Sequence, residues 1–341
     1  MRIGAALAAT LFAGACGGAG VPAAPASASP ASPTVSAAIT YAAPSAAPTD
    51  RPIAAVLERV DPGKLNDHMA ALASFGSRDV RNPNHAKAVA YLKEQLGAIP
   101  GITVESHRAA YNGIPLENIF ALVDPLTPPR GTAWVMVCAH YDSIANRTPG
   151  WNPATTAAPG ADDNGTGTAA LLEYARVLSQ ERASLRQRVV LAFFDGEELF
   201  FKGSAAYVGT LPSLDQYAAV INIDMVGFNP IADRLDLIWY TSGSAALRDR
   251  VIAANDRYQI GVSPLVPQLA TSGATILDAA PFGLAGIPAV ALVQRYGDAD
   301  ATFPGNDTFH TANDTPDKVT NKRLWLKAAK LTLATALELA R

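Results

Sequence analysis

Residues 133–142 read AWVMVCAHYD, a continuous apolar run that ends at a histidine and an aspartate. Uninterrupted apolar runs of this length are typical of strands that are buried on both faces of a sheet. Residues 189–198, VVLAFFDGEE, repeat this pattern, with an apolar run followed directly by acidic residues. Between the two runs, residues 166–178 have the apolar spacing of a helix. A strand, a helix and a second strand in this order indicate an α/β fold.

The same alternation extends from residue 51 to residue 341. Helical spacing is found in four further segments, 57–75, 86–96, 244–258 and 321–339. Strand patterns are found at 218–223 and 289–293, which are apolar throughout, at 235–240, which alternates more, and at 103–110 and 117–123, which resemble half-buried edge strands. Strands that alternate with helices predict a single domain with a central mixed, mainly parallel sheet sandwiched by helices.

The first 50 residues differ in composition from the rest. Arg2 and the apolar, Ala-rich segment 3–15 predict an export signal that is too short to span a bilayer. The box AGAC that ends at Cys16 resembles the lipidation site of bacterial lipoproteins, and an ordinary signal peptidase site within 13–24 is the alternative. Residues 17–50, rich in Ala, Pro and Ser, are predicted to be a flexible linker.

We therefore divide the chain into a signal segment (1–16), a linker (17–50) and a folded domain (51–341). The protein is expected to be exported to the periplasm, to the cell envelope or to the medium. A membrane would be a partner only through a lipid on Cys16. Nucleic acid is not an expected partner, because the net charge is −3 and no basic run occurs. The other cysteine, Cys138, lies inside an apolar run and is predicted to be a buried small hydrophobe.

Two histidines and three acidic residues of the metal-binding type follow one another along the chain. They are His140, Asp163, Glu198, Asp224 and His310. His140 and Asp224 end apolar runs, Glu198 follows one closely, Asp163 lies in a turn before a predicted helix, and His310 lies in a loop after the last predicted strand. Ligands bind beyond the carboxyl ends of strands in open α/β sheets, so we expect a common site there. Zinc prefers His nitrogen and carboxylate oxygen, and two zinc ions can share a bridging carboxylate.

Two acidic neighbours complete a hydrolytic site. Asp142, two residues after His140, is placed to accept the second imidazole N–H and to fix the tautomer. Glu197, adjacent to Glu198, is free to take the proton of the attacking water and to deliver it to a leaving amine. Glu197 and Asp142 are therefore the candidate catalytic residues.

Each of these residues alone also has a purely structural explanation. A histidine beside a strand is usually structural, an aspartate in the turn 160–165 can cap a helix, and a pair of glutamates can simply be solvated. Their joint occurrence favours a metal site. The other histidines, His68, His85 and His107, have no neighbouring acidic motif and are interpreted as surface or capping residues.

Five sequence blocks carry a resemblance to a known family. They are AHYDS (139–143), PGADDNGTGTAALLE (159–173), FFDGEELFFKGSAAYV (193–208), NIDMVG (222–227) and FHTANDTPD (309–317). In order and spacing they resemble the motif blocks of the co-catalytic zinc aminopeptidase family of the bacterial leucyl-aminopeptidase type. Relatives of that family include glutamate carboxypeptidase II, the transferrin receptor and glutaminyl cyclase. The resemblance covers about residues 51–341.

The resemblance implies a role for each candidate residue. The implied ligands are His140 and Asp224 for one zinc ion, Glu198 and His310 for the other, and Asp163 as the bridge. Glu197 would be the general base. A cis peptide bond between Asp163 and Asn164 is implied as well. The expected cofactors are two Zn²⁺ ions, for which Co²⁺ or Mn²⁺ can substitute.

Two positions depart from the family pattern. Phe309 stands where some relatives have a tyrosine implied to steady the tetrahedral intermediate, and it has no hydroxyl group. Asp278 keeps the acid of another block, in which the following histidine is replaced by Ala279. Donors to the oxyanion would then be the metal ions or another residue, such as Tyr240 or Arg295. The candidate substrate-binding residues are Asp278, Phe309 and Trp151.

The leading hypothesis is an exported, metal-dependent aminopeptidase acting on peptides. The alternative is a glutaminyl cyclase that acts on N-terminal glutamine with a single zinc ion. The missing histidine at Ala279 and the blocks around Asp163 and His310 favour the peptidase. A carboxypeptidase stays open because specificity depends on loops, and a non-catalytic relative is disfavoured because no ligand is missing.

Overall fold

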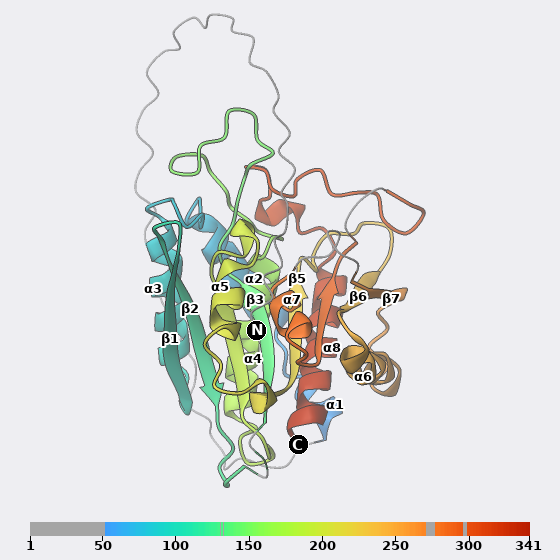
Figure 1. The fold of residues 1–341 in the computed structure, drawn as a ribbon. Helices are drawn as coiled ribbons and strands as arrows, with labels where there is room; N and C mark the ends of the chain where they lie inside the picture. Colours follow the sequence, from blue (N-terminus) through green and yellow to red (C-terminus); the bar gives the residue numbers. More distant parts are fainter. Residues whose placement is uncertain (1–51, 130, 132, 271–276, 296–298) are drawn as a thin grey trace, which may run out of the picture. The chain divides into compact units, whose positions relative to one another are not determined.

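Figure 1 shows the fold of the computed structural model, which describes residues 52–129, 131, 133–270, 277–295 and 299–341. The predicted signal segment with Cys16, the predicted linker 17–50 and residue 51 lie outside the described residues. In the part of the chain that is described, no helix combines the length and the apolar composition needed to cross a membrane.

An eight-stranded mixed sheet forms the centre of the described structure. Its strands are β1 (Ile102–Tyr111), β2 (Ile114–Val123), β3 (Trp134–His140), β4 (Val189–Phe194), β5 (Tyr217–Asp224), β6 (Leu235–Trp239), β7 (Leu265–Leu269) and β8 (Ala289–Val293). In space they follow the order β1, β2, β4, β3, β5, β8, β6, β7. The four central strands β4, β3, β5 and β8 are parallel, whereas β2 pairs antiparallel with β1 and β4, and β6 pairs antiparallel with β8. The predicted α/β fold with a mixed, mainly parallel sheet is confirmed.

Helices cover both faces of this sheet (Figure 1). They are α1 (Ile53–Leu57), α2 (Pro62–Ser74), α3 (His85–Gly97), α4 (Gly165–Ser179), α5 (Lys202–Val208), α6 (Ala245–Arg257), α7 (Ala280–Leu284) and α8 (Lys322–Ala340), with short 3₁₀ helices η1 (Glu197–Leu199), η2 (Leu214–Gln216), η3 (Ser242–Ser244) and η4 (Pro316–Lys318). Val135 and Val137 of β3 join a large buried cluster with residues of α2, α4, α6 and α8. Met136 and Cys138 join a smaller cluster with Phe282 of α7. This division follows from the two-residue period of a strand.

Three features differ from the sequence-based predictions. The helix predicted over 57–75 is interrupted, because Pro62 begins α2 and the Asp61 side chain caps it by accepting the N–H of Gly63 at 2.8 Å. The strand predicted at 117–123 begins at Ile114, and it lies between β1 and β4 and not at an edge. The elements β7, α5 and α7 were not predicted; each has at most 7 residues, too few to show a clear period.

The interpretation of His68 as a surface or capping residue is wrong. His68 lies on α2 with no exposed surface, and its Nδ1 atom is 2.8 Å from the hydroxyl oxygen of Tyr91 on α3. Burial, followed by the positive charges of Lys64 and Arg176, lowers the pKa of His68 to about 3. The imidazole is therefore neutral in the folded protein at neutral pH and packs as part of the core.

We expect His68 to make the fold sensitive to acid. In the unfolded chain its imidazole takes up a proton below about pH 6.5, whereas in the folded chain it does so only near pH 3. Its stabilising contribution is thus complete above pH 6.5 and declines as the pH falls from there toward 3. Between those limits the free energy of unfolding of His68→Gln should fall less steeply with acid than that of the wild type, by up to about 1.4 kcal/mol per pH unit. Parallel pH dependences of the two proteins in urea titrations would contradict this expectation.

Candidate metal centre

Three neighbouring parallel strands, β4, β3 and β5, bring Glu198, His140 and Asp224 to one edge of the sheet. His140 is the last residue of β3 and lies opposite Phe194, the last residue of β4. Asp224 ends β5 and lies opposite Val293, the last residue of β8. Glu198 follows β4 in η1. Because parallel strands end at the same edge, these side chains enter one common space, as expected from the sequence.

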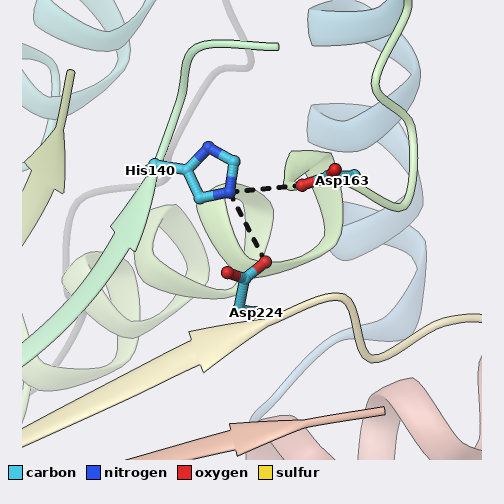
Figure 2. Close-up of side chains that lie close together, drawn as sticks. All are labelled: His140, Asp163 and Asp224. Carbon is cyan, nitrogen blue, oxygen red and sulfur yellow. Dashed lines mark ion pairs between the residues drawn. The ribbon is translucent and has the colours of Figure 1, made fainter. Parts of the chain in front are cut away.

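His140, Asp163 and Asp224 form a first ligand group (Figure 2). The Nε2 atom of His140 lies 3.2 Å from Oδ1 of Asp163 and 3.5 Å from Oδ1 of Asp224. All three side chains are buried. One ligand atom from each residue lies within 4.8 Å of the others, close enough for the three to hold one metal ion.

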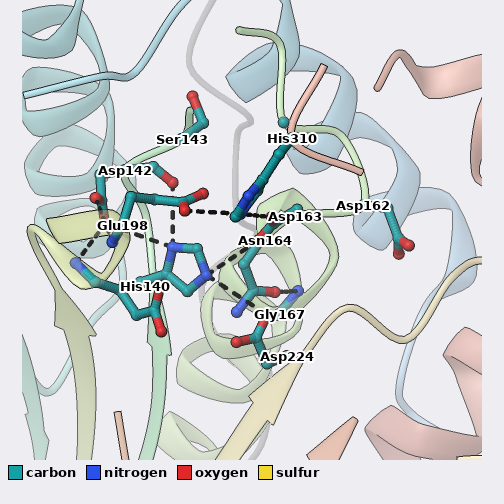
Figure 3. A network of polar contacts seen from close by, with 12 residues as sticks. His140, Asp142, Ser143, Asp162, Asp163, Asn164, Gly167, Glu198, Asp224 and His310 are labelled. Atoms are coloured by element: carbon teal, nitrogen blue, oxygen red, sulfur yellow. Dashed lines mark hydrogen bonds and ion pairs between the residues drawn. The ribbon is translucent and has the colours of Figure 1, made fainter. Parts of the chain in front are cut away.

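Asp163 belongs to a second group as well, with Glu198 and His310 (Figure 3). The Nε2 atom of His310 lies 3.1 Å from Oδ2 of Asp163 and 2.9 Å from Oε2 of Glu198. The two oxygens of Asp163 therefore face different histidines, Oδ1 toward His140 and Oδ2 toward His310. A carboxylate placed in this way is able to bridge two metal ions.

Asp314 connects the His310 loop to the turn that carries Asp163. Its Oδ1 accepts a hydrogen bond from the backbone N–H of Asp162 at 3.1 Å, and its Oδ2 accepts one from the N–H of Asp163 at 3.0 Å. His310 itself has a φ of 57°, a left-handed conformation that residues other than glycine seldom adopt. Because Asp314 is four residues after His310, its two hydrogen bonds fix the turn that carries Asp163 relative to His310.

The start of α4 connects the same turn to β5. Asn164 accepts the N–H of Gly167 at 2.8 Å and donates to the carbonyl of Ile223 at 3.0 Å. A Cβ atom at position 167 would lie 2.3 Å from Oδ1 of Asn164 and 2.5 Å from the Ile223 carbonyl oxygen, so glycine is required there. The peptide bond between Asp163 and Asn164 is cis, as the family resemblance implies.

Asp142 contacts both His140 and the segment that carries the two glutamates (Figure 3). Its carboxylate oxygens accept the backbone N–H groups of Glu197 and Glu198, each at 3.2 Å. Its Oδ1 also lies 3.4 Å from Nδ1 of His140, and its backbone oxygen lies 3.2 Å from the same nitrogen. The position suits the orienting role that the sequence predicted, and the contacts with Glu197 and Glu198 add a second one.

Several of the candidate ligands act electrostatically on the carboxyl group of Glu197. Burial raises the pKa of its carboxyl group well above the usual range; His140 partly opposes this, and the negative charges of Glu198 and Asp278 add to it. Cations held by the neighbouring candidate ligands would favour the ionised carboxylate, which is the form that accepts a proton. The environment of Glu197 is therefore suited to the role predicted for it.

The donor set fits zinc on grounds of hydrogen bonding and of charge. The Oε1 atom of Glu198 is buried and has no hydrogen-bond donor among the described residues. Burial, followed by the charge of Asp163, raises the pKa of Glu198 to about 8. Burial opposes protonation of His310, but the charges of Glu198 and Asp163 raise its pKa to about 10. The raised pKa values show that, without cations, the carboxylates of this site bind protons or pair with protonated imidazoles. Bound metal cations would supply the positive charge instead.

The three predicted substrate-binding residues have different surroundings. Phe309 stacks on His310, with ring centroids 3.7 Å apart, and so lies at the candidate metal centre. Asp278 is fully buried, and burial raises the pKa of its carboxyl group to about 7. Trp151 lies under the guanidinium group of Arg81, 5.0 Å from the ring centre. None of the hydrogen bonds or ring contacts of Trp151 within the described residues involves the five candidate ligands.

Tyr240 and Arg295, the alternative oxyanion donors, are placed differently. The Tyr240 hydroxyl is buried and has no hydrogen-bond partner within the described chain, and burial, together with Cys138 and Asp278, raises its pKa well above the usual value. Arg295 forms an ion pair with Asp300 at 2.9 Å. Tyr240 thus offers a buried donor, whereas Arg295 is already engaged.

Other residues that support the site carry no motif in the sequence. Arg78 is fully buried and donates to the carbonyls of Tyr141 at 2.6 Å and Gly160 at 2.9 Å, so it joins the segment after β3 to the Asp163 turn. His85 is not a simple surface residue, because its Nε2 lies 2.9 Å from Oδ1 of buried Asp195. Along the chain, Tyr141 lies 63 residues from Arg78, and Asp195 lies 110 residues from His85. No local sequence pattern signals such contacts.

Comparisons with known proteins identify one family model that matches this chain and several proteins that are similar to it. The model of Peptidase family M28 matches residues 118–336. The chain is 26% identical over 311 residues to leucine aminopeptidase 1 of Coccidioides posadasii (strain C735), covering 84% of this chain and 74% of the relative. BSAP, a zinc aminopeptidase from Bacillus subtilis, is 28% identical with a TM-score of 0.54, covering 68% of this chain and 52% of that one. The glutaminyl cyclase of Porphyromonas gingivalis, at 24% identity, shares the fold with a TM-score of 0.66, covering 82% of this chain and 99% of that one.

Proposed function

The chain belongs to peptidase family M28, and we propose that it is a zinc aminopeptidase that removes N-terminal residues from peptides with two zinc ions and one general base. The observation that carries this proposal is the position of Asp163, whose two oxygens face His140 and His310. A carboxylate shared by two ligand groups is the arrangement that a two-metal hydrolytic site requires. The likeness to a zinc aminopeptidase from Bacillus subtilis supports the choice of metal.

In this proposal the residues of the chain have distinct tasks. The ions would be held by His140, Asp163 and Asp224 on one side and by Asp163, Glu198 and His310 on the other. When bound, zinc ions polarise the scissile carbonyl and make water more acidic. Glu197 takes the proton of the attacking water and returns it to the nitrogen of the leaving amine. Asp142 keeps Glu197 in position through the backbone N–H that it accepts at 3.2 Å.

We also propose that the enzyme acts outside the cytoplasm. Support comes from the composition of the signal segment 1–16 and of the linker 17–50. A lipid on Cys16 would anchor the linker to a membrane, and the domain from residue 51 onward would then reach peptides in the surrounding medium. Peptides are the proposed substrates.

A glutaminyl cyclase is the second candidate function. It is favoured by the fold shared with the cyclase of Porphyromonas gingivalis, of which 99% is covered. Such an activity would use a single zinc ion, so it gives no role to a second ligand group that shares Asp163. The peptidase accounts for both groups, and for this reason we prefer it.

Hydrolysis assays with the full-length chain test this proposal. We expect stepwise loss of N-terminal residues from unblocked peptides and release of the anilide from aminoacyl anilides, whereas N-acetylated peptides stay intact. Chelation should abolish the activity and zinc should restore it, because the proposed reaction requires bound zinc ions to activate water. Products are followed by mass spectrometry. Loss of ammonia from peptides that begin with glutamine, without shortening of any peptide, would instead establish the cyclase.

A further inference from the structure

A pocket of about 300 Å³ adjoins the metal centre. Its apolar walls include Met225, Phe303 and Phe309. Met225 directly follows the ligand Asp224, and Phe309 directly precedes the ligand His310 and stacks on it. Because the walls adjoin one candidate ligand from each group, the pocket lies beside the place where the proposed function puts the reacting bond.

The polar part of this pocket is positively charged. Arg147 and Arg295 line it, together with the neutral side chains of Gln294 and Asn306. Within the described chain no carboxylate contributes to the lining. A pocket that combines apolar walls with guanidinium groups favours an anionic ligand whose carbon chain contacts the walls.

Arg147 is held next to the His310 loop. Its backbone N–H donates to the carbonyl of His310 at 3.0 Å, and its Nη1 donates to the carbonyl of Phe309 at 2.8 Å. Its guanidinium carbon lies 5.7 Å from the centre of the Phe309 ring. Among the residues that the structure describes, no carboxylate forms an ion pair with Arg147. The position of this positive charge is thus set by carbonyl groups that do not neutralise it.

Arg295 is positioned by an acidic residue outside the pocket lining. Its Nη1 lies 2.9 Å from Oδ2 of Asp300, which also lies 3.0 Å from Nη1 of Arg234. Arg234 pairs in addition with Asp236 at 2.9 Å. These two acids balance Arg234 and Arg295, so the charge of Arg147 remains in excess.

We infer that this pocket binds a carboxylate of the substrate and selects peptides whose first residue is aspartate or glutamate. The inference rests on the proposed aminopeptidase activity and adds a substrate class to it. Guanidinium groups bind carboxylates through paired, charge-assisted hydrogen bonds, and Met225 and Phe309 receive the methylene groups. Glutamine has the same shape without the charge, and lysine is repelled by Arg147. The C-terminal carboxylate of a dipeptide substrate offers the same chemical group to this pocket.

Kinetics with matched substrates test the inference on the full-length, zinc-loaded chain. For the wild type we expect kcat/KM for glutamyl anilide to exceed that for glutaminyl anilide by about ten- to hundredfold. The ratio should fall toward one in Arg147→Ala and in Arg147→Gln, which retains a hydrogen-bond donor without the charge, because kcat/KM for glutamyl anilide should fall more than kcat/KM for leucyl anilide. Arg295→Ala should lower the ratio less than the Arg147 variants do, because Asp300 already pairs with Arg295. The control is Arg108→Ala, an exposed arginine on β1 that should leave the ratio unchanged.

Further measurements identify the source of the carboxylate. Faster hydrolysis of Leu-Ala than of Leu-Ala amide, lost in Arg147→Gln, would assign the pocket to a peptide terminus. Calorimetry with L-glutamate and L-glutamine tests the pocket without turnover, and tighter binding of glutamate, lost in Arg147→Gln, would support it. Equal rates for the glutamyl and glutaminyl anilides and for the dipeptide and its amide, with normal hydrolysis of leucyl anilide, would overturn the inference and leave the proposed function intact. Failure to hydrolyse any substrate would overturn the proposed function, and calorimetry alone would then decide the inference.

Discussion

Replacement of Glu197 by glutamine is expected to lower kcat by about 10²- to 10⁴-fold, the usual contribution of a general acid–base residue. Glutamine keeps the shape of the side chain but cannot take a proton from water. The backbone N–H of residue 197 can still donate to Asp142, so the ligand Glu198 should remain in place. We therefore expect the metal content of Glu197→Gln to equal that of the wild type.

The test is to measure metal binding and turnover separately, because a general base affects only turnover. Zinc content after dialysis and kcat for leucyl anilide are determined on the same samples. The matched control is Glu105→Gln, a change at an exposed residue on β1 that should alter neither quantity. If Glu197→Gln retained most of the wild-type kcat, another residue would have to act as the base. If it lost zinc along with its activity, Glu197 would be a ligand.

Replacement of Asp163 by alanine is expected to remove both zinc ions, because this residue supplies one ligand atom to each group. The affinity for each ion should fall by more than about 100-fold, since loss of outer partners of a metal ligand alone costs about 10–100-fold. Asp224→Ala is the matched comparison, because Asp224 belongs to the first group alone. That variant should lose one ion and retain most of its affinity for the other.

Zinc stoichiometry by mass spectrometry and titration calorimetry distinguish these cases, and circular dichroism confirms that each variant is folded. Two tightly bound ions in Asp163→Ala would disprove the bridge. Loss of a single ion from Asp163→Ala, with the same result for Asp224→Ala, would mean that Asp163 serves one metal only. In either outcome the two-zinc part of the proposed function would need revision.

The sequence predicted those parts of the site that are close to a strong local pattern. His140 and Asp224 are the last residues of β3 and β5, whose apolar runs are evident without a structure. Glu198 lies within a few residues of β4. Where a strand is buried on both faces, its sequence is apolar throughout and its end is marked by the first polar residue. For this reason the sequence could define the edge of the sheet at which the residues meet.

The sequence was less informative where a residue depends on distant contacts. No local sequence pattern marks His68 as buried, yet it lies in the core against Tyr91. The strand predicted over 117–123 was interpreted as an edge strand, because its antiparallel partner on the inner side, β4, lies far along the chain. Such errors arise because burial and pairing are properties of the whole fold, whereas composition and period describe only a few neighbouring residues.

The chain by itself thus determined an α/β fold, the carboxyl edge of its central strands and the types of residue that gather there. Only the tertiary structure decided that Asp163 faces His140 with one oxygen and His310 with the other, and that Asp314 holds this turn. It alone placed Arg147 beside Phe309, 162 residues further along the chain. The physical reason is that local sequence sets which strands and turns form, whereas bonds between distant segments exist only after the sheet has brought those segments together.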